Sequence, residues 1–145
     1  MEQLDFSQVK GVLIDVDGTL VNTQKDLVQV TKNAIKSLVK QRFVVGLCTG
    51  RSFPVIKNYI LPIFPEESVH VVDDGGRLVT KQGDDLFASL IKGKFIKKIA
   101  LKALELGADF GFGQEKIHYY NQRLLKIIKS ADKWDKELGD PAELN

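Results

Sequence analysis

The chain has 145 residues, of which 43% are apolar and 28% charged, a composition typical of a folded globular protein and not of a disordered or fibrous one. This length suffices for one ordinary domain, or for one domain and part of another. The net charge is only +2 and the lysines are spread along helix-like stretches, so the charge pattern requires neither a nucleic-acid nor a membrane partner. No stretch approaches the ~20 apolar residues that a membrane helix needs.

The single cysteine, Cys48, stands inside an apolar run. One cysteine excludes a disulfide framework or a cysteine-based metal cluster within one chain, and we expect this thiol to be buried and inert. The acidic N-terminus lacks the basic-then-apolar pattern of a signal peptide. Together these features predict a reducing, cytoplasmic location.

The first 60 residues alternate short apolar runs with helical spacing. Residues 11–17 form a run rich in β-branched side chains, which predicts a strand of a parallel sheet buried on both faces. Apolar residues then recur every three or four positions from Thr23 to Gln41, as in an amphipathic helix. A second apolar run from Phe43 to Cys48 predicts the next strand, and the spacing over 55–60 predicts the next helix. The apolar face of the first helix is expected to comprise Leu27, Val30, Ala34, Leu38 and Val39.

A third short strand is predicted over Val69 to Val72. The turn Asp73-Asp74-Gly75-Gly76 leads from it into a hairpin return over Arg77 to Thr80. The order strand, helix, strand, helix, strand predicts an α/β fold with an open parallel sheet and right-handed crossovers.

The pattern changes after about Gln82. A turn-rich segment at Gly83-Asp84-Asp85 predicts the domain boundary, with one domain over 1–82 and a small α+β piece over 83–145. Beyond it we expect a helix from Lys94 to Leu106 and aromatic-rich strands near 109–112 and 116–120. Packing between strands explains the aromatic residues here better than a substrate pocket does: Phe110, Phe112, Tyr119 and Tyr120. We interpret five lysines as a solvated helix face: Lys92, Lys94, Lys97, Lys98 and Lys102. The two histidines, His70 and His118, are interpreted as core or rim residues.

Polar residues follow the predicted strands at their carboxyl ends, where the ligand sites of open α/β sheets lie. Asp15 and Asp17 end the first strand, Thr49 follows the second, and Asp73 follows the third. Two aspartates separated by one residue suit Mg²⁺, a hard cation that binds a few oxygen ligands together with a substrate phosphate. Asp15 can offer a carboxylate oxygen, and Asp17 can contribute its backbone carbonyl while its side chain points elsewhere. The sequence therefore predicts a magnesium and phosphate site at this edge of the sheet.

This arrangement favours phosphoryl transfer. Bound Mg²⁺ would offset the repulsion between Asp15 and a phosphoryl anion, so that Asp15 can attack phosphorus and form an aspartyl-phosphate. Asp17 would protonate the leaving oxygen and later activate water, which requires a pKa well above the usual value of about 3.9. The Thr49 hydroxyl and the Gly50 amide would bind the transferring group. Either motif alone is common in plain turns, whereas both at consecutive strand ends favour catalysis.

The run DVDGTL after an apolar strand, followed by LCTGRS after the next, resembles the haloacid dehalogenase (HAD) superfamily. The segment VHVVDDGGRLVTKQG is similar to the strand and hairpin of its Cof-type branch, in which the hairpin leads into an α/β cap. The resemblance covers about residues 10–82 well and the cap loosely. It implies a Rossmann-like HAD core with a partial cap, Asp15 as nucleophile and metal ligand, Asp17 as acid, base and metal ligand, and Thr49 as phosphate binder.

Two features depart from the family pattern. Asp74 stands where that branch commonly has asparagine, near an expected substrate contact. The lysine that stabilises the nucleophile and the later acidic magnesium loop follow the cap in that branch, and the resemblance implies that this chain stops before them. The closing Gly139-Asp140-Pro141 lacks a preceding strand, and Lys116, Lys126 and Lys129 are better interpreted as solvated cap residues.

Two functions stay open at this point. One is a magnesium-dependent phosphatase acting on small phosphate monoesters, such as sugar phosphates or related metabolites, with weak or no turnover unless another chain supplies the missing groups. The other is a non-catalytic regulatory module that retains the loop binding phosphate and metal. A truncated parallel sheet would leave an unpaired edge, so dimerisation or domain swapping, which would give a homodimer, is also expected.

Overall fold

The computed structural model describes residues 8–22, 24–114, 117–123 and 142–143. Its contacts divide the chain into two units. The first unit comprises the chain up to Arg51 together with Lys57–Ala88, and the second comprises Ser52–Ile56 together with the chain from Ser89 onward. Among the described residues, no helix is both long and apolar enough to cross a membrane.

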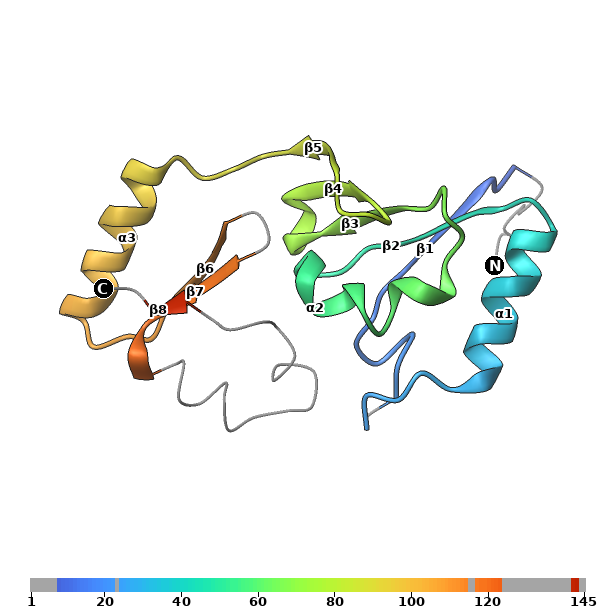
Figure 1. The fold of residues 1–145 in the computed structure, drawn as a ribbon, viewed down its shortest axis with the longest axis horizontal. Helices are drawn as coiled ribbons and strands as arrows, with labels where there is room; N and C mark the ends of the chain where they lie inside the picture. The colour runs from blue at the N-terminus through green and yellow to red at the C-terminus, as the bar shows by residue number, and fades with distance from the viewer. Residues whose placement is uncertain (1–7, 23, 115–116, 124–141, 144–145) are drawn as a thin grey trace, which may run out of the picture. The chain divides into compact units, whose positions relative to one another are not determined.

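The first unit begins with the predicted order of strand, helix and strand (Figure 1). Strand β1 covers Gly11–Ile14, helix α1 covers Gln29–Lys40, and strand β2 covers Val44–Leu47. The two strands pair in parallel, with Gly11 opposite Val44 and Ile14 opposite Leu47. Parallel neighbours need a crossover between them, and α1 provides it.

Helix α1 is shorter at its start than the predicted span from Thr23. Its first turn is preceded by extended backbone at Val28, and the Asn22 Oδ1 accepts the Asp26 amide at 2.8 Å. Local hydrogen bonding of this kind by an asparagine side chain competes with helix formation. The helix therefore starts six residues later, at Gln29.

The buried face of α1 also differs from the predicted one. Val30 is 73% exposed, whereas Ile35, which the prediction left out, is fully buried. Leu38 and Val39, three and four residues after Ile35, are half-buried. The predicted set was wrong at Val30 and Ala34, because the helix turns a face centred on Ile35 toward the sheet.

The chain continues through helix α2, Phe53–Lys57, and the short 3-10 helix η1, Leu61–Ile63, to strand β3, Val69–Val72. β3 lies parallel beside β2, because Cys48 and Val71 form a parallel bridge and the Thr49 amide donates to the Val71 carbonyl at 3.0 Å. After the turn η2, Asp73–Gly75, strand β4 covers Arg77–Thr80 and pairs antiparallel with β3. The predicted strand and hairpin are confirmed.

Strand β5, Asp85–Ala88, pairs antiparallel with β4, so the first unit extends to Ala88 and past the boundary predicted at residue 82. The turn signal at Gly83 closes a hairpin here: the Gly83 amide donates to the Thr80 carbonyl at 3.0 Å, and the Asp84 amide donates to the Thr80 hydroxyl at 3.1 Å. The assignment of residues 83–145 to a cap domain stays a prediction.

The second unit contains helix α3, Gly93–Glu105, and strands β6, Gly111–Gln114, and β7, Ile117–Tyr120, which pair antiparallel. Strand β8, Ala142–Glu143, pairs in parallel with β7. Phe110 and Phe112 are half-buried. The lysines interpreted as a solvated helix face are exposed: Lys92, Lys94, Lys97, Lys98 and Lys102. Outside the described residues or side chains lie Lys116, His118, Tyr119, Tyr120, Lys126, Lys129 and Gly139 to Pro141.

The strand register of the first unit separates two faces of its sheet, because paired residues point to the same side. One face is largely buried and carries Val12, Ile14, Val45, Leu47, His70, Val72 and Val79. We call the other the open face; it carries Gly11, Leu13, Val44, Gly46, Cys48, Val69, Val71, Leu78, Thr80 and Phe87.

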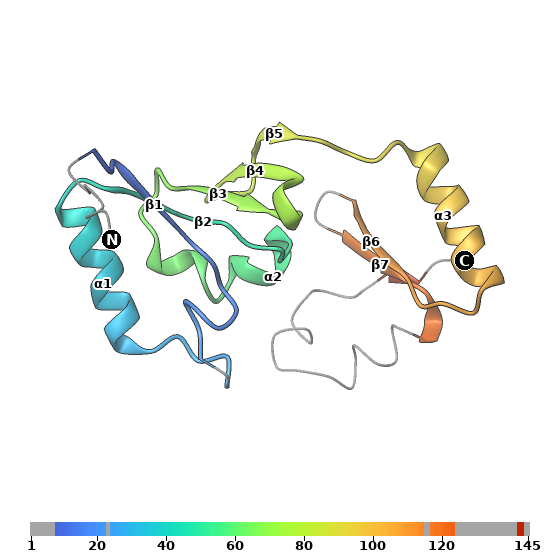
Figure 2. The ribbon, with the colours of Figure 1, turned by 180° about the vertical axis from the view of Figure 1, so that it is seen from behind.

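The open face corrects two predictions. β1 was expected to be buried on both sides, but its Leu13 is 59% exposed. Cys48 was expected to be buried, but it is exposed. Helix α1 contacts β2, and both views show it alongside β1 and β2 (Figures 1 and 2). The packing on the opposite side of the sheet leaves Leu13 and Cys48 in solvent.

Candidate active site

Three loops of the first unit carry the predicted site residues, one after each of β1, β2 and β3. The loop after β1 is anchored by Val16 and Leu20, which are buried, and the Val16 carbonyl accepts the Leu20 amide at 3.0 Å. Gly18 has a φ of 74°, a left-handed conformation that favours glycine. The tight turn leaves Asp15 and Asp17 exposed to solvent, where a ligand can reach them.

The loop after β2 carries Thr49 and Gly50. Thr49 is only 5% exposed, and its Oγ1 accepts the Arg51 amide at 3.2 Å. A hydroxyl that accepts this bond still has its own proton to donate. Thr49 can therefore donate a hydrogen bond to a phosphoryl oxygen while it holds the turn.

The loop after β3 is tied to the loop after β2, because the Asp73 amide donates to the Arg51 carbonyl at 3.1 Å. Asp73 and Asp74 both have a φ of 54°, which aspartate tolerates better than most residues. This backbone brings the Asp74 carboxylate against Gly50, so close that a Cβ at position 50 would lie 2.5 Å from Asp74 Oδ1. Glycine at position 50 permits the approach, and Asp74 joins the candidate site.

Arg51 joins the loops after β1 and β2 through a bidentate ion pair with Asp17. Its Nε lies 2.6 Å from Asp17 Oδ2, and its Nη2 lies 2.7 Å from Asp17 Oδ1. The prediction did not include Arg51 among the site residues, although it directly follows Thr49 and Gly50. Its place directly after the Thr49-Gly50 motif was the signal in the sequence, because an arginine at a strand end next to one that carries aspartates is a candidate bidentate partner of a carboxylate.

The ion pair changes the expected chemistry of Asp17. The hydrogen bonds from Arg51 and, beyond them, its charge and that of Lys25 hold the pKa of Asp17 below its usual value, although partial burial acts in the opposite direction. The expectation of a raised pKa is therefore wrong for this structure. Asp17 is ionised and held while Arg51 lies against it.

Asp15 and Asp17 are the residues that would hold Mg²⁺ at this site. Asp15 is exposed and offers carboxylate oxygens, the ligand type that Mg²⁺ prefers together with water and phosphate. The Asp17 carboxylate is held by Arg51. Among the residues that the structure describes, no three His, Cys, Asp or Glu side chains gather into a metal-binding group. Asp15 thus fits the ion. The backbone carbonyl of Asp17, the ligand predicted from the sequence, is also an oxygen of the kind that Mg²⁺ binds, whereas the Asp17 side chain could bind it only after Arg51 has moved away.

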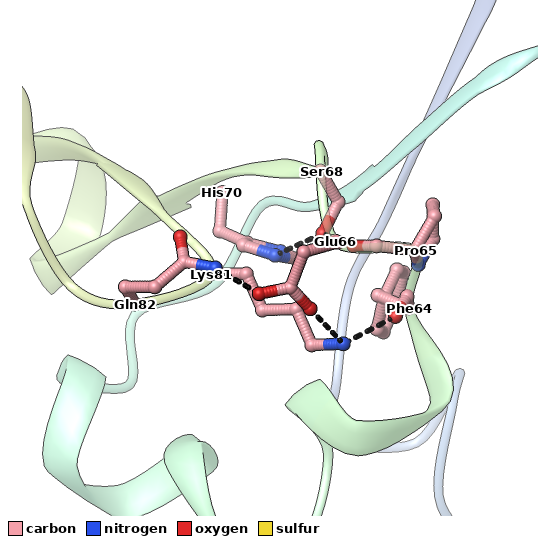
Figure 3. Close-up of polar contacts among 7 residues, drawn as sticks. All are labelled: Phe64, Pro65, Glu66, Ser68, His70, Lys81 and Gln82. Carbon is pink, nitrogen blue, oxygen red and sulfur yellow. Dashed lines mark hydrogen bonds and ion pairs between the residues drawn. The ribbon is translucent and has the colours of Figure 1, made fainter.

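A buried histidine supports the end of β2 from the covered side of the sheet. His70 Nδ1 accepts the Leu47 amide at 3.2 Å, and its Nε2 lies 2.8 Å from the hydroxyl of Ser68, which donates to the Pro65 carbonyl at 2.7 Å (Figure 3). Because Nδ1 accepts a hydrogen bond, the neutral ring carries its proton on Nε2. The interpretation of His70 as a core residue is confirmed.

Burial, and to a smaller extent the charge of Lys81, lowers the pKa of His70 to about 4. Lys81 donates to the Phe64 carbonyl at 2.8 Å and pairs with Glu66 at 3.2 Å, while Gln82 also bonds to Glu66 (Figure 3). These contacts join the β4 end of the hairpin to the segment before β3. The side chains of Glu66, Ser68, Lys81 and Gln82 thus each have a polar partner, in a network beside the neutral imidazole of His70.

Known proteins share both the sequence pattern and the fold. A model of the family described as haloacid dehalogenase-like hydrolase matches residues 12–143. The 5-amino-6-(5-phospho-D-ribitylamino)uracil phosphatase YwtE of Bacillus subtilis (strain 168) is 31% identical over 77 residues, which make up 50% of this chain and 27% of that protein.

Solved structures extend the likeness over nearly the whole chain. A haloacid dehalogenase-like hydrolase from B. subtilis has a TM-score of 0.74 at 18% identity, over 93% of this chain and 53% of its own. A HAD subclass IIB sugar phosphatase has a TM-score of 0.75 at 17% identity, over 94% of this chain and 52% of its own. The chain spans about half the length of these structures and has part of their α/β fold.

Proposed function

This chain belongs to the haloacid dehalogenase-like hydrolase family, and on that premise we propose that it is a magnesium-dependent phosphatase acting on small phosphate monoesters through Asp15. The observation that supports the proposal is the meeting of two loops at the carboxyl ends of the adjacent strands β1 and β2. One loop carries Asp15 and Asp17, the other carries Thr49 and Gly50, and Arg51 connects them at 2.6 Å. This is the edge of a parallel sheet where ligands bind.

In the proposed reaction a carboxylate oxygen of Asp15 attacks phosphorus, and the ester P–O bond breaks as the new P–O bond forms. The leaving oxygen takes a proton from Asp17 and departs as an alcohol. Water then attacks phosphorus and the bond between phosphorus and the Asp15 oxygen breaks, while Asp17 takes a proton from the water, so that inorganic phosphate and free Asp15 result. Thr49 and Gly50 donate hydrogen bonds to the phosphoryl oxygens throughout. Bound Mg²⁺, held by Asp15, would offset the negative charge of the phosphoryl group.

The ion pair between Asp17 and Arg51 sets a condition on this reaction. Asp17 can carry a proton only after Arg51 has left it, because the pair stabilises the ionised carboxylate. A phosphoryl group bound at Thr49 would offer Arg51 another bidentate acceptor close by. We therefore include in the proposal that substrate binding draws Arg51 away and frees Asp17.

The proposed substrates are sugar phosphates or related metabolites. The named relatives support this class, since one is a sugar phosphatase and the other a phosphatase of a phosphorylated ribitylaminouracil. The chain spans only about half the length of the solved relatives. That this half by itself turns over substrate is therefore also a proposal. A cytoplasmic location stays a prediction from the sequence.

A second function is favoured by one observation. Asp17 is ion-paired and its pKa is lowered, the state of a binding residue and not of a proton donor. This supports a non-catalytic module that binds phosphate and metal without turnover.

A phosphatase screen with Mg²⁺ over a panel of phosphorylated metabolites separates the two functions. The wild type is compared with Asp15→Asn and with the control Glu67→Gln, which removes an exposed carboxylate outside the three site loops. Turnover that Asp15→Asn abolishes and Glu67→Gln keeps would support the phosphatase. Phosphate binding that needs Mg²⁺, without turnover of any compound, would support the binding module instead.

A further inference from the structure

The carboxylate of Asp74 stands beside Gly50, whose amide the proposed function assigns to the phosphoryl group. A Cβ at Gly50 would lie 2.5 Å from Asp74 Oδ1 and 3.7 Å from Oδ2, so the carboxylate points at this residue. A Cβ lies about 2.5 Å from the amide nitrogen of its own residue, which places Asp74 Oδ1 at most about 5 Å from the Gly50 nitrogen. A group bound at that amide is therefore within reach of the Asp74 charge.

The charge of Asp74 has no partner within the part of the chain that the structure describes. Its side chain is exposed and forms neither a hydrogen bond nor an ion pair with another described residue. Two other aspartates of the site loops differ in this respect. Asp17 is paired with Arg51, and Asp73 lies 3.6 Å from a guanidinium nitrogen of Arg77. The carboxylate of Asp74 is thus available to a ligand.

Three contacts hold the turn that presents Asp74. The Asp73 amide donates to the Arg51 carbonyl at 3.1 Å, and the Asp73 carbonyl accepts the Gly76 amide at 2.9 Å. The ion pair between Asp73 and Arg77 ties the same turn to strand β4. Within the turn, Asp74 has a φ of 54° and a ψ of 33°, a left-handed conformation. Its carboxylate is therefore held in place before a ligand arrives.

We propose that Asp74 is a specificity-determining residue, which selects phosphate monoesters that carry an ammonium group close to the phosphate. This selection rests on the proposed function, because it requires the phosphoryl group to bind at Thr49 and Gly50. The ionised carboxylate attracts the ammonium group and repels a substrate whose only charges are those of the phosphate. A carboxylate accepts hydrogen bonds and donates none, and an ammonium group offers it three donors together with a positive charge. The substrate class thereby narrows from phosphorylated metabolites in general to those that bear an amine.

The size of the selection follows from Coulomb's law. At a separation of about 6 Å and a dielectric constant of about 40 to 80, one unit charge changes the affinity by about three- to tenfold. Salt should reduce this preference in the wild type, since raising the ionic strength from about 0.01 to about 1 M shortens the screening length from about 30 to about 3 Å. A preference that salt leaves unchanged would not come from the charge of Asp74.

Isothermal titration calorimetry of the full chain with Mg²⁺ tests the proposal on two phosphonates, whose P–C bond the proposed reaction cannot break. The first, 2-aminoethylphosphonate, carries an ammonium group, and the second, 2-hydroxyethylphosphonate, has a hydroxyl in the same place. The wild type should bind the amino compound about three- to tenfold more tightly. Asp74→Asn should bind both about equally, and it keeps the turn because asparagine also tolerates the left-handed backbone. The control Glu67→Gln, which removes an exposed charge outside the site loops, should keep the preference.

A preference that Asp74→Asn abolishes and Glu67→Gln keeps supports the role of Asp74. Equal binding of both compounds by the wild type overturns it, and so does a preference that Asp74→Asn retains. Thr49→Val separates this failure from that of the proposed function. If Thr49→Val weakens the binding of both compounds, the phosphoryl group lies at Thr49, and a missing preference counts against Asp74 alone. If it leaves their binding unchanged, or if neither compound binds to the wild type, the proposed phosphate site is refuted and the selection by Asp74 with it.

Discussion

Arg51 donates hydrogen bonds to both carboxylate oxygens of Asp17, from Nε at 2.6 Å and from Nη2 at 2.7 Å, although the two residues lie 34 positions apart in the chain. The pair links the loop that bears the proposed nucleophile with the loop that bears the proposed phosphate binder. It also opposes protonation of Asp17, the residue from which the proposed reaction would take its proton. The ion pair is therefore a point at which the proposed chemistry can be tested directly.

Arg51→Met should raise the pKa of Asp17, because the variant removes the hydrogen bonds and the charge that lower it. The measurement is the carboxyl titration of Asp17 by carbon-detected NMR in the protein without ligand. Lys40→Met, which neutralises a basic residue at the end of α1, is the control and should leave the midpoint in place. An unchanged midpoint in Arg51→Met would show that the ion pair does not form in solution.

The buried His70 predicts a loss of stability in mild acid. Its pKa is about 4 in the folded chain and about 6.5 when unfolded, so between these values the unfolded state binds a proton that the folded state does not. The contribution is fully present above pH 6.5 and is lost as the pH falls toward 4, by up to about 3 kcal/mol.

Urea unfolding at intervals between pH 4 and 8 measures this slope. His70→Gln should flatten the slope between pH 4 and 6.5, because glutamine does not titrate. The pKa of Asp17 is lowered from its usual value of 3.8, so protonation of Asp17 reduces the stability mainly below pH 3.8, outside this window. A wild-type stability that stays level down to pH 4.5 would contradict the buried neutral imidazole.

Gly46→Ala should destabilise the first unit by about 2 kcal/mol, because the added Cβ would overlap the Val69 backbone carbonyl of the neighbouring strand. Backbone atoms of a sheet cannot move aside as the end of a side chain can. Gly93→Ala is the matched control, since a Cβ at Gly93, in α3, meets nothing within 4 Å and should be neutral or slightly stabilising. Chemical denaturation of both variants gives the comparison, and equal stabilities would refute the close approach of β2 and β3.

Thr49→Val should weaken the binding of orthophosphate in the presence of Mg²⁺ by about tenfold, because valine keeps the shape of threonine but offers no hydroxyl to the anion. It also leaves the Arg51 amide without its side-chain acceptor. Thr49→Ser keeps the hydroxyl and should bind close to the wild type. Isothermal titration calorimetry distinguishes them, and equal affinity for Thr49→Val and the wild type would place the phosphate elsewhere.

Local patterns in the sequence were sufficient wherever a structure depends on near neighbours. Strand β3 and the return strand β4 have the predicted bounds, because alternating side chains and a turn rich in aspartate and glycine specify a hairpin within a dozen residues. The family resemblance and the partial α/β fold are confirmed as well, since both rest on short motifs at the ends of strands. The roles given to Asp15, Asp17, Thr49 and Gly50 stay predictions.

The sequence by itself thus determined the order of the elements from β1 to β4, the family, and the strand ends at which the polar residues stand. Only the tertiary structure decided which face of α1 packs around Ile35, that Cys48 lies on an open face, and that Arg51 reaches Asp17. Burial depends on which other segments cover a surface, and an ion pair across two loops depends on how the strands before them are aligned. Neither is encoded in the spacing of residues along one element, so the composition of the Asp15 loop predicted a carboxylate site but not the arginine that holds it.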